Sequence, residues 1–236
     1  MTPVCPSHVT LAPPPTPDAA DHPDGFVAGN FFDKYRSTSR IHRHLMDGFI
    51  RAARAFMQAA QPRRVLEVGC GSGDLADRLL DPAVWPAARV PEYCGTDVSP
   101  EQIALARARY PGRAFQTCSV YRLPYPDASV DLVVACEVLE HLADPARALD
   151  EIARVTRGHV LISVPREPLW RALNLCRGAY WRHFGNTPGH VQHFSVRSLR
   201  RLVGRRFVVD AERRPIPWIM MLARRPESSA GFLVEV

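Results

Sequence analysis

Apolar positions along the chain change their spacing at regular intervals. From about residue 62, short runs of apolar and β-branched residues alternate with segments in which apolar residues recur at helical spacing. The pattern predicts strands at residues 64–68, 92–96, 114–118, 130–135, 159–164, 207–211 and 218–223, and helices at 74–80, 100–109, 143–157 and 196–203. Because strands and helices alternate, we expect an α/β fold. Its seven-stranded sheet would be mostly parallel, with helices on both faces and a closing antiparallel hairpin.

The regions outside this alternation define the expected domain organisation. Residues 1–25 contain seven of the 22 prolines, so we expect an extended or disordered segment. Residues 26–61 show helical spacing and predict one or two helices before the sheet. The main domain then covers residues 62–225. A long aromatic and arginine-rich insertion at 165–194 interrupts it, and we expect this insertion to face the substrate. A tail follows at 226–236.

The first predicted strand leads into the most distinctive turn of the sequence. Glu67 stands near the end of the strand, and Gly69, Gly71 and Gly73 follow at every second position. A turn with almost no side chains lets a flat or bulky ligand approach the backbone. In open α/β sheets, ligands bind beyond the carboxyl ends of the strands. We therefore expect four strand ends to converge on one crevice: residues 67–73, Asp97, 118–120 and 136–137.

Two cofactors compete for this crevice. Gly71-x-Gly73-x-x-Ala76, followed by Asp97 at the next strand end, satisfies the pattern of a dinucleotide-binding turn. A carboxylate at Glu67, however, would repel a pyrophosphate and attract a ligand with an ammonium or sulfonium charge. S-adenosylmethionine carries both charges, so the residues favour it over NAD.

Three longer motifs carry a family resemblance. VLEVGCGSG, GTDVSPEQIALAR and LPYPDASVDLVVACEVLEHLADP resemble the successive motifs of class I S-adenosylmethionine-dependent methyltransferases. More narrowly, they are similar to small-molecule methyltransferases related to the ubiquinone and menaquinone biosynthesis enzymes. The resemblance covers residues 62–164 and, with the closing hairpin, extends to about residue 223. It implies a Rossmann-like sheet, methyltransferase activity and S-adenosylmethionine as the cofactor.

The resemblance also implies which positions bind the cofactor. The glycine turn would wrap the methionine and ribose portion, Asp97 would accept both ribose hydroxyls, and Val98 would pack on the adenine. Relatives often carry Asp where Ser119 stands, so adenine recognition would fall to the backbone and the serine hydroxyl. Tyr35, on the N-terminal helices, would close the pocket or belong to the core. The full set of expected cofactor-binding residues is Tyr35, Glu67, Gly69, Cys70, Gly71, Gly73, Asp97, Val98, Ser119, Val120, Cys136 and Glu137.

Three histidines are candidates for the chemistry. Methyl transfer from a sulfonium is an in-line displacement in which the enzyme mainly positions donor and acceptor. An oxygen nucleophile also needs a base, and imidazole titrates near the right pH. His141 follows the fourth predicted strand, while His190 and His193 follow a turn at residues 188–189. We predict that one of the three is the general base. The alternative is that they hydrogen-bond the backbone and fix the insertion.

A metal site is the weaker alternative for the same region. Glu137-x-x-Glu140-His141 would place two carboxylates on neighbouring positions of a helical turn, beside an imidazole. A distant His190 or His193 could complete an oxygen and nitrogen set suited to Mg²⁺, Mn²⁺ or Zn²⁺. The spacing resembles the E-x-x-E-H pattern of a subset of class I methyltransferases that recruit a divalent cation. Because the Glu-His pair is also common in relatives without a metal, the sequence favours a metal-free site.

The insertion supplies the candidate substrate-binding residues. Arg166 directly follows the fifth predicted strand and would clamp a carboxylate or phosphate, unless it is an ordinary solvated arginine. Trp170 and Trp181 would cover a ring or sugar face, or bury the insertion's own core. The insertion and its flanks resemble methyltransferases of bacterial glycan and natural-product biosynthesis.

We therefore expect O-methylation of a polar small molecule, such as a sugar, a nucleotide-linked intermediate or a specialised metabolite. N- or C-methylation and use of the fold for a different reaction stay open as alternatives.

The composition and charge of the chain limit the binding partners and the cellular compartment that we expect. The formal net charge of +6 comes almost wholly from arginine, but no block of five basic residues occurs, so nucleic acid is not favoured. No run of 18 apolar residues predicts a membrane span, and no secretory signal precedes the domain. The six cysteines are scattered without CxxC pairs, which indicates reduced thiols in a cytoplasmic protein. The sequence indicates no oligomeric state.

Overall fold

A computed structural model of the chain describes residues 39–86, 89–176, 178, 180–187 and 189–226. The predicted proline-rich segment, the first part of the predicted N-terminal helices with Tyr35, and the tail beyond residue 226 lie outside the described residues.

The described residues form one sheet of seven strands with helices around it. The strands are β1 (Arg64–Val68), β2 (Glu92–Asp97), β3 (Ala114–Thr117), β4 (Val130–Cys136), β5 (Thr156–Pro165), β6 (Val208–Arg213) and β7 (Trp218–Arg224). The helices are α1 (Arg40–Ala60), α2 (Asp74–Leu79), α3 (Pro100–Arg109), α4 (Pro145–Val155), α5 (Leu169–Cys176) and α6 (Val196–Val203). Short 3₁₀ helices are η2 (Leu139–His141) and η3 (Trp181–His183).

Local sequence fixes where two of these helices begin. The side chain of Ser99 accepts a hydrogen bond from the amide of Gln102, and that of Asp144 accepts one from the amide of Arg147. Each capping residue is followed by proline, which suits the first helical position. These signals were visible in the sequence, and α3 has the predicted bounds.

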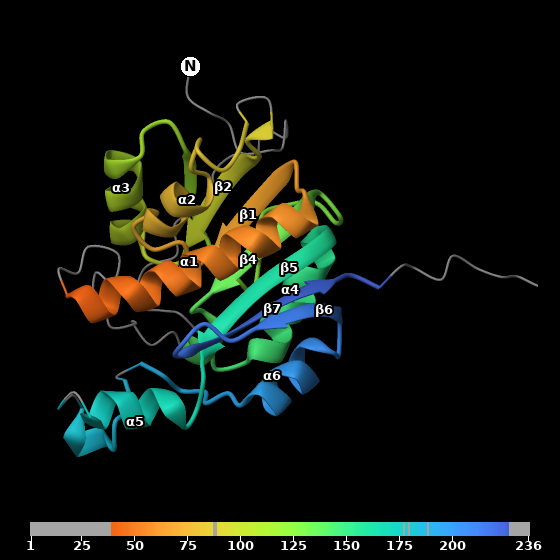
Figure 1. Cartoon of the computed structure of the whole chain (residues 1–236). Helices are drawn as coiled ribbons and strands as arrows, with labels where there is room; N and C mark the ends of the chain where they lie inside the picture. The colour runs from red at the N-terminus through yellow and green to blue at the C-terminus, as the bar shows by residue number, and fades with distance from the viewer. Residues whose placement is uncertain (1–38, 87–88, 177, 179, 188, 227–236) are drawn as a thin grey trace, which may run out of the picture.

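The strand order in the sheet is β3-β2-β1-β4-β5-β7-β6 (Figure 1). Strands β1 to β5 pair in parallel, and β7 runs antiparallel to both β5 and β6. The order reverses direction between β1 and β4, and a ligand crevice is expected at such a switch point. The predicted fold, a mostly parallel Rossmann-like sheet with a closing antiparallel hairpin, is confirmed.

Alternate residues of each central strand serve two separate cores. On β4, Leu132 and Val134 pack with residues of α1 and α2, whereas Val133 and Ala135 pack with residues of α4 and α6. Figure 1 shows α1 and α2 in front of the sheet. This period of two explains why the central strands are apolar at nearly every position, since both faces are covered.

The main difference from the predicted boundaries lies between α4 and β5. The predicted helix at 143–157 ends at Val155, and the strand begins at Thr156 instead of residue 159. Thr156 pairs with Val130 of β4, and its hydroxyl donates to the Val130 carbonyl at 3.4 Å. Tertiary pairing with the neighbouring strand therefore ends the helix two residues earlier than the apolar spacing predicts.

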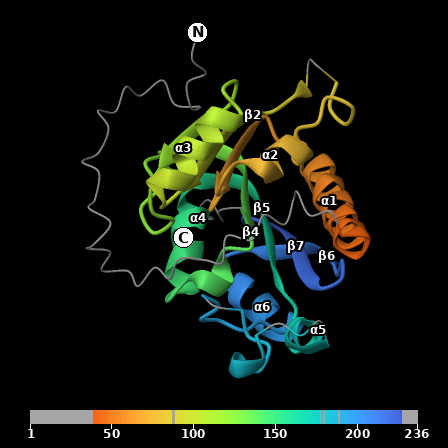
Figure 2. The same ribbon diagram turned by 90° about the vertical axis from the view of Figure 1, so that its left-hand side faces the viewer.

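The insertion at 165–194 has structure of its own. It contains α5 and η3, and its two ends meet where Arg166 and Phe194 form an isolated parallel bridge. Both views place α5 at the lower end of the molecule, beside the sheet (Figures 1 and 2). In the part of the chain that the structure describes, no helix is both long and apolar enough to cross a membrane.

Candidate active site

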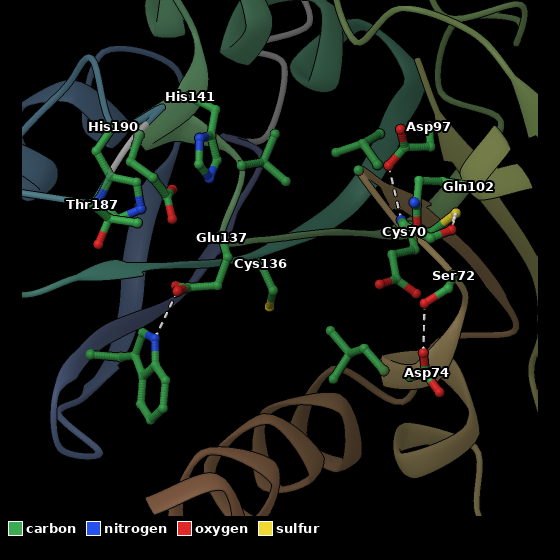
Figure 3. Close-up of a pocket in the computed structure, with 18 of the residues that line it drawn as sticks. Cys70, Ser72, Asp74, Asp97, Gln102, Cys136, Glu137, His141, Thr187 and His190 are labelled. Atoms are coloured by element: carbon green, nitrogen blue, oxygen red, sulfur yellow. Dashed lines mark hydrogen bonds between the residues drawn. The ribbon is translucent and has the colours of Figure 1, made fainter. Parts of the chain in front are cut away.

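A cavity of about 1010 Å³ opens at the carboxyl ends of β1, β2 and β4. Figure 3 shows its two ends, with Asp97, Gln102 and Ser72 at one and His141 with His190 at the other, and with Glu137 between them. Ligand pockets commonly measure about 300–1,000 Å³, so this one has room for a large cofactor and an acceptor together.

The glycine turn forms the wall of the first end. Gly69 has a φ of +67°, a conformation that L side chains rarely adopt, and a Cβ placed on it would lie 2.6 Å from Cγ2 of Val138. The amide of Gly71 donates to Oδ2 of Asp97 at 2.9 Å, which ties the turn to the end of β2. Gly73 does not line the cavity; it is the N-cap residue of α2, and a Cβ placed on it would lie 2.8 Å from the ring of Phe115. Two of the three glycines therefore line the cavity.

Two carboxylates flank this turn. Glu67 is 3% exposed, lines the cavity, and accepts a hydrogen bond from the hydroxyl of Tyr93 at 2.6 Å. Asp97 also accepts from the amide of Ser99 at 2.9 Å. Burial raises the pKa of Asp97, and the amides of Ser99 and Gly71 oppose that rise by stabilising the carboxylate. Both acids lie where the sequence predicted them to meet a ligand.

Most of the other predicted cofactor-binding residues also line the cavity: Cys70, Val98, Ser119, Val120, Cys136 and Glu137. The hydroxyl of Ser119 accepts from the amide of Tyr121 at 3.2 Å, so it is partly engaged within its own loop. Gln102 and Leu105 of α3 line the same end. Sequence reasoning missed both, because only the approach of α3 to the turn brings them there.

Glu137 marks the exit of β4 and has an unusual backbone. Its φ is +60°, which is uncommon for a residue other than glycine and often occurs at functional sites. The indole of Trp218 donates to Oε2 of Glu137 at 2.7 Å, and the hydroxyl of Ser163 donates to Oε1 at 3.3 Å. The predicted helical turn with Glu137 and Glu140 on neighbouring positions is therefore wrong. Only Leu139–His141 is helical, and the chain turns at Glu137.

The three predicted catalytic histidines separate into two groups. His141 and His190 both line the cavity, with their ring centroids 4.9 Å apart. Nδ1 of His141 lies 2.9 Å from the carbonyl oxygen of Gly189 and therefore donates to it, because a carbonyl can only accept. His193 is exposed, does not line the cavity, and bonds through Nε2 to Oδ1 of Asn186 at 3.0 Å. For His193 the structural alternative fits better.

Glu140 joins the two cavity histidines. Its side chain is 1% exposed, and its backbone carbonyl accepts from the amides of Val191 and Gln192 at 2.9 and 3.0 Å. These backbone bonds attach the end of the insertion to η2 and bring His190 beside His141. Ligand atoms of Glu140, His141 and His190 all lie within 4.8 Å of one another.

Of the predicted substrate-binding residues, some line the cavity and others do not. Trp170 lines the cavity and stacks on His190 with ring centroids 6.0 Å apart. Arg166 does not line it, because its amide donates to the carbonyl of Pro217 and its backbone pairs with Phe194 at the sheet end. Trp181 is 66% exposed and also lies outside the lining. The geometry thus gives no support to an arginine clamp.

The insertion adds lining residues that sequence reasoning missed, Leu173, Asn174 and Thr187, and Tyr180, one of its predicted aromatic residues, also lines the cavity. Asn174 is 4% exposed and donates to the carbonyl of Gly185 at 2.8 Å, and the indole of Trp170 donates to the hydroxyl of Thr187 at 2.9 Å. The signal available in the sequence was the presence of polar residues in an otherwise aromatic segment, because polar groups that become buried need hydrogen-bond partners.

Cys70 and Cys118, which both line the cavity, are poorly suited to act as nucleophiles. Cys70, Cys118 and Cys176 carry free thiols, and Cys94 is in a disulfide bond, so the predicted reduced state does not hold for all six cysteines. Burial raises the pKa of Cys118 to about 12 and raises that of Cys70 well above its usual range. A thiolate nucleophile needs a lowered pKa, so neither residue is suited to covalent catalysis.

A family model described as a methyltransferase domain matches residues 40–206. The chain belongs to the methyltransferase-domain family. A Mycobacterium tuberculosis relative, named a probable S-adenosylmethionine-dependent methyltransferase, is 41% identical over 102 residues, which cover 43% of this chain and 35% of the relative. The chain thus spans about a third of that relative's length. A demethylmenaquinone methyltransferase of Chlorobaculum parvum is 31% identical over 160 residues, covering 62% of this chain and 64% of the relative.

Solved structures agree with this fold. The magnesium protoporphyrin IX methyltransferase of Synechocystis, solved with bound SAH, has a TM-score of 0.61 and 17% identity, covering 82% of this chain and 94% of that chain. The family model confirms the predicted methyltransferase domain, and the relatives that the chain resembles are named for S-adenosylmethionine and for demethylmenaquinone, in line with the predicted resemblance. The family model and the relative named for S-adenosylmethionine support the predicted cofactor.

Proposed function

We propose that this chain is an S-adenosylmethionine-dependent methyltransferase that methylates a hydroxyl group of a small acceptor. One observation carries the proposal: a single cavity joins the glycine turn and Asp97 at one end to His141 and His190 at the other (Figure 3). A cofactor and an acceptor bound in the two ends would meet near Glu137. Holding them in this geometry supplies much of the rate of an in-line displacement.

The residues at the first end fit the proposed cofactor. The bare turn at Gly69 leaves no side chain between the backbone and a ligand. Asp97 offers a carboxylate that can accept both ribose hydroxyls, and Glu67 adds negative charge beside an ammonium or sulfonium group. Bound S-adenosylmethionine supplies an electrophilic methyl group on its sulfonium. A pyrophosphate would meet two carboxylates instead.

The residues at the second end fit hydroxyl activation. Because Nδ1 of His141 donates to Gly189, the lone pair of the neutral ring is on Nε2. The C–O bond forms as the C–S bond breaks, and the sulfur keeps the electron pair and becomes the neutral thioether of S-adenosylhomocysteine. The hydroxyl proton passes to a histidine, and the buried carboxylate of Glu140 would stabilise the positive charge of the protonated imidazole. The general-base prediction therefore narrows to His141 and His190.

The lining of the second end supports an acceptor that contains a ring. Trp170 and Tyr180 offer aromatic surface, and Leu173 adds apolar surface. Asn174 and Thr187 supply the few polar groups that orient a ligand in such pockets. The relative named for demethylmenaquinone is consistent with a ring, and a sugar ring would also stack on these side chains.

The experiment combines calorimetry and turnover on the full chain. S-adenosylmethionine should bind the protein, and a panel of hydroxylated aromatic rings and sugars should be tested with a donor labelled on the methyl group. His190→Ala should lower turnover at least tenfold with little change in cofactor affinity. His193→Ala is the matched control, because His193 faces Asn186 outside the cavity. Absence of cofactor binding, or equal turnover of the two variants, would refute the proposal.

A further inference from the structure

A polar pair lies among the aromatic side chains at the acceptor end of the cavity. Asn174 of α5 and Thr187 both line the cavity, yet they are only 4% and 8% exposed. We propose that this pair binds a neutral polar group of the acceptor that both accepts and donates a hydrogen bond, such as a hydroxyl or a carboxamide. The inference rests on the proposed function, because it names the acceptor chemistry of the same cavity.

The close approach of the segment after η3 to α5 brings the two residues together. Gly185 has a φ of +76°, and a Cβ placed on it would clash with the carbonyl oxygen of Arg171. Glycine therefore lets this segment lie against the helix. The carbonyl of Gly185 then accepts a hydrogen bond from Nδ2 of Asn174 at 2.8 Å, and the same nitrogen lies 3.3 Å from the hydroxyl oxygen of Thr187.

The bonding partners fix the polarity of the Thr187 hydroxyl. The indole of Trp170 donates to Oγ1 at 2.9 Å, and Nδ2 of Asn174 donates to the same oxygen at 3.3 Å. Neither nitrogen can accept a hydrogen bond, so these two bonds use both lone pairs of Oγ1. The hydroxyl proton is left, and no group among the described residues accepts it. Towards a ligand, Thr187 is therefore a donor.

Asn174 presents the opposite polarity. The carbonyl of Gly185 can only accept, so the amide nitrogen must face it, and this fixes which side-chain atom is the oxygen. Gly185 and Thr187 together take both protons of Nδ2. Within the described part of the chain nothing donates to the amide oxygen Oδ1, and this atom is not sealed from solvent. Towards a ligand, Asn174 is therefore an acceptor.

A donor beside an acceptor selects the kind of group that binds. A hydroxyl or a carboxamide satisfies both, whereas a carboxylate or a phosphate would bring only acceptor oxygens to Oδ1 of Asn174. An ammonium would bring only donors to the proton of Thr187. Arg109, the only arginine or lysine among the described lining residues, is already ion-paired with Asp74 at 2.8 Å. The pair therefore favours a neutral group over an anion.

The pair also lies beside the histidines proposed to take the hydroxyl proton. The indole of Trp170, which donates to Thr187, stacks on the ring of His190 with centroids 6.0 Å apart. The amide of His190 donates to the carbonyl of Thr187 at 3.1 Å, and Figure 3 shows the two residues at the same end of the cavity. An acceptor ring whose neutral polar group neighbours the reactive hydroxyl fits this arrangement.

The test is calorimetric binding of ring fragments to the full chain saturated with S-adenosylhomocysteine. Salicylamide and salicylate carry the same ring and hydroxyl and differ in the neutral carboxamide or the carboxylate beside it, and phenol lacks both groups. We expect salicylamide to bind at least about tenfold more tightly than salicylate or phenol. Thr187→Val should abolish this preference, and Thr187→Ser, which keeps the hydroxyl, should retain it. Thr117→Val is the matched control, because Thr117 ends β3 outside the cavity.

A second fragment keeps the proposal testable if Thr187→Val fails to fold. In 2-hydroxyacetophenone a methyl group replaces the amino group of salicylamide, so the donor to Asn174 is lost while the shape is kept. It should bind the native chain at least about tenfold more weakly than salicylamide. Equal affinity for these two fragments, no binding of salicylamide, tighter binding of salicylate, or a folded Thr187→Val variant with the native preference would overturn the proposal.

The affinity for S-adenosylhomocysteine, measured on the same samples, tests the proposed function separately. A chain that binds this compound but shows no preference for salicylamide keeps the methyltransferase proposal and loses the polar pair. A chain that does not bind it loses the methyltransferase proposal, and the preference among fragments, measured on the chain alone, then decides whether the polar pair selects neutral groups.

Discussion

Replacing Gly69 by alanine tests whether the bare turn is a physical requirement. The added Cβ would lie 2.6 Å from Cγ2 of Val138, and the backbone would keep a φ of +67°. A left-handed conformation costs an alanine about 1–2 kcal/mol. Forcing a methyl group into packed surroundings costs about 1–3 kcal/mol more, and Val138, at 8% exposure, has little space to move into. We expect Gly69→Ala to lower the free energy of unfolding by about 2–5 kcal/mol.

Urea denaturation followed by circular dichroism measures this loss. With a slope of about 2 kcal/mol per molar, the midpoint should fall by about 1–2.5 M. Gly112→Ala is the control, since its Cβ would meet nothing within 4 Å and its backbone is not left-handed. We expect the control to change stability by less than about 0.5 kcal/mol. Equal midpoints for the two variants would refute the reasoning about the turn.

Three further predictions concern single contacts. Affinity for S-adenosylmethionine should fall on acidification through the raised pKa of Asp97, because only the carboxylate accepts both ribose hydroxyls. In calorimetry, Asp97→Asn should bind the cofactor at least tenfold more weakly and should lack that pH dependence. Trp218→Phe removes the hydrogen-bond donor to Glu137 and should slow turnover. The control, Trp85→Phe, removes a buried hydrogen bond from the indole to the carbonyl of Leu79 outside the cavity, so it should cost about 1–2 kcal/mol of stability and leave turnover unchanged. The hydrogen bond from Arg154 lowers the pKa of Glu151, so the stability that this carboxylate contributes is present at neutral pH and is lost as the pH falls below about 4.5. In urea denaturation, Glu151→Gln should be about 1–2 kcal/mol less stable than the native chain at pH 7, and the difference in stability should be smaller at pH 4.

The sequence by itself determined the sheet and the cofactor end of the cavity. Both depend on short-range patterns: apolar runs that need cover on two faces, a turn that only glycines make easily, and acids at strand ends. Because parallel strands present their carboxyl ends at one edge, the predicted residues from Glu67 to Glu137 had to meet there. Residues on separate strands that line this end of the cavity were therefore predictable one strand at a time.

Only the tertiary structure decided the acceptor end. His190 and His193 are three residues apart and look equivalent in the sequence, yet backbone bonds to Glu140 direct one into the cavity while Asn186 holds the other outside it. The left-handed backbone of Glu137 likewise separated two carboxylates that helical spacing would have placed together. The bonds that bring His190 to the cavity join segments about 50 residues apart. Local spacing carries no information about such bonds, which form only after the insertion folds back onto the end of β4.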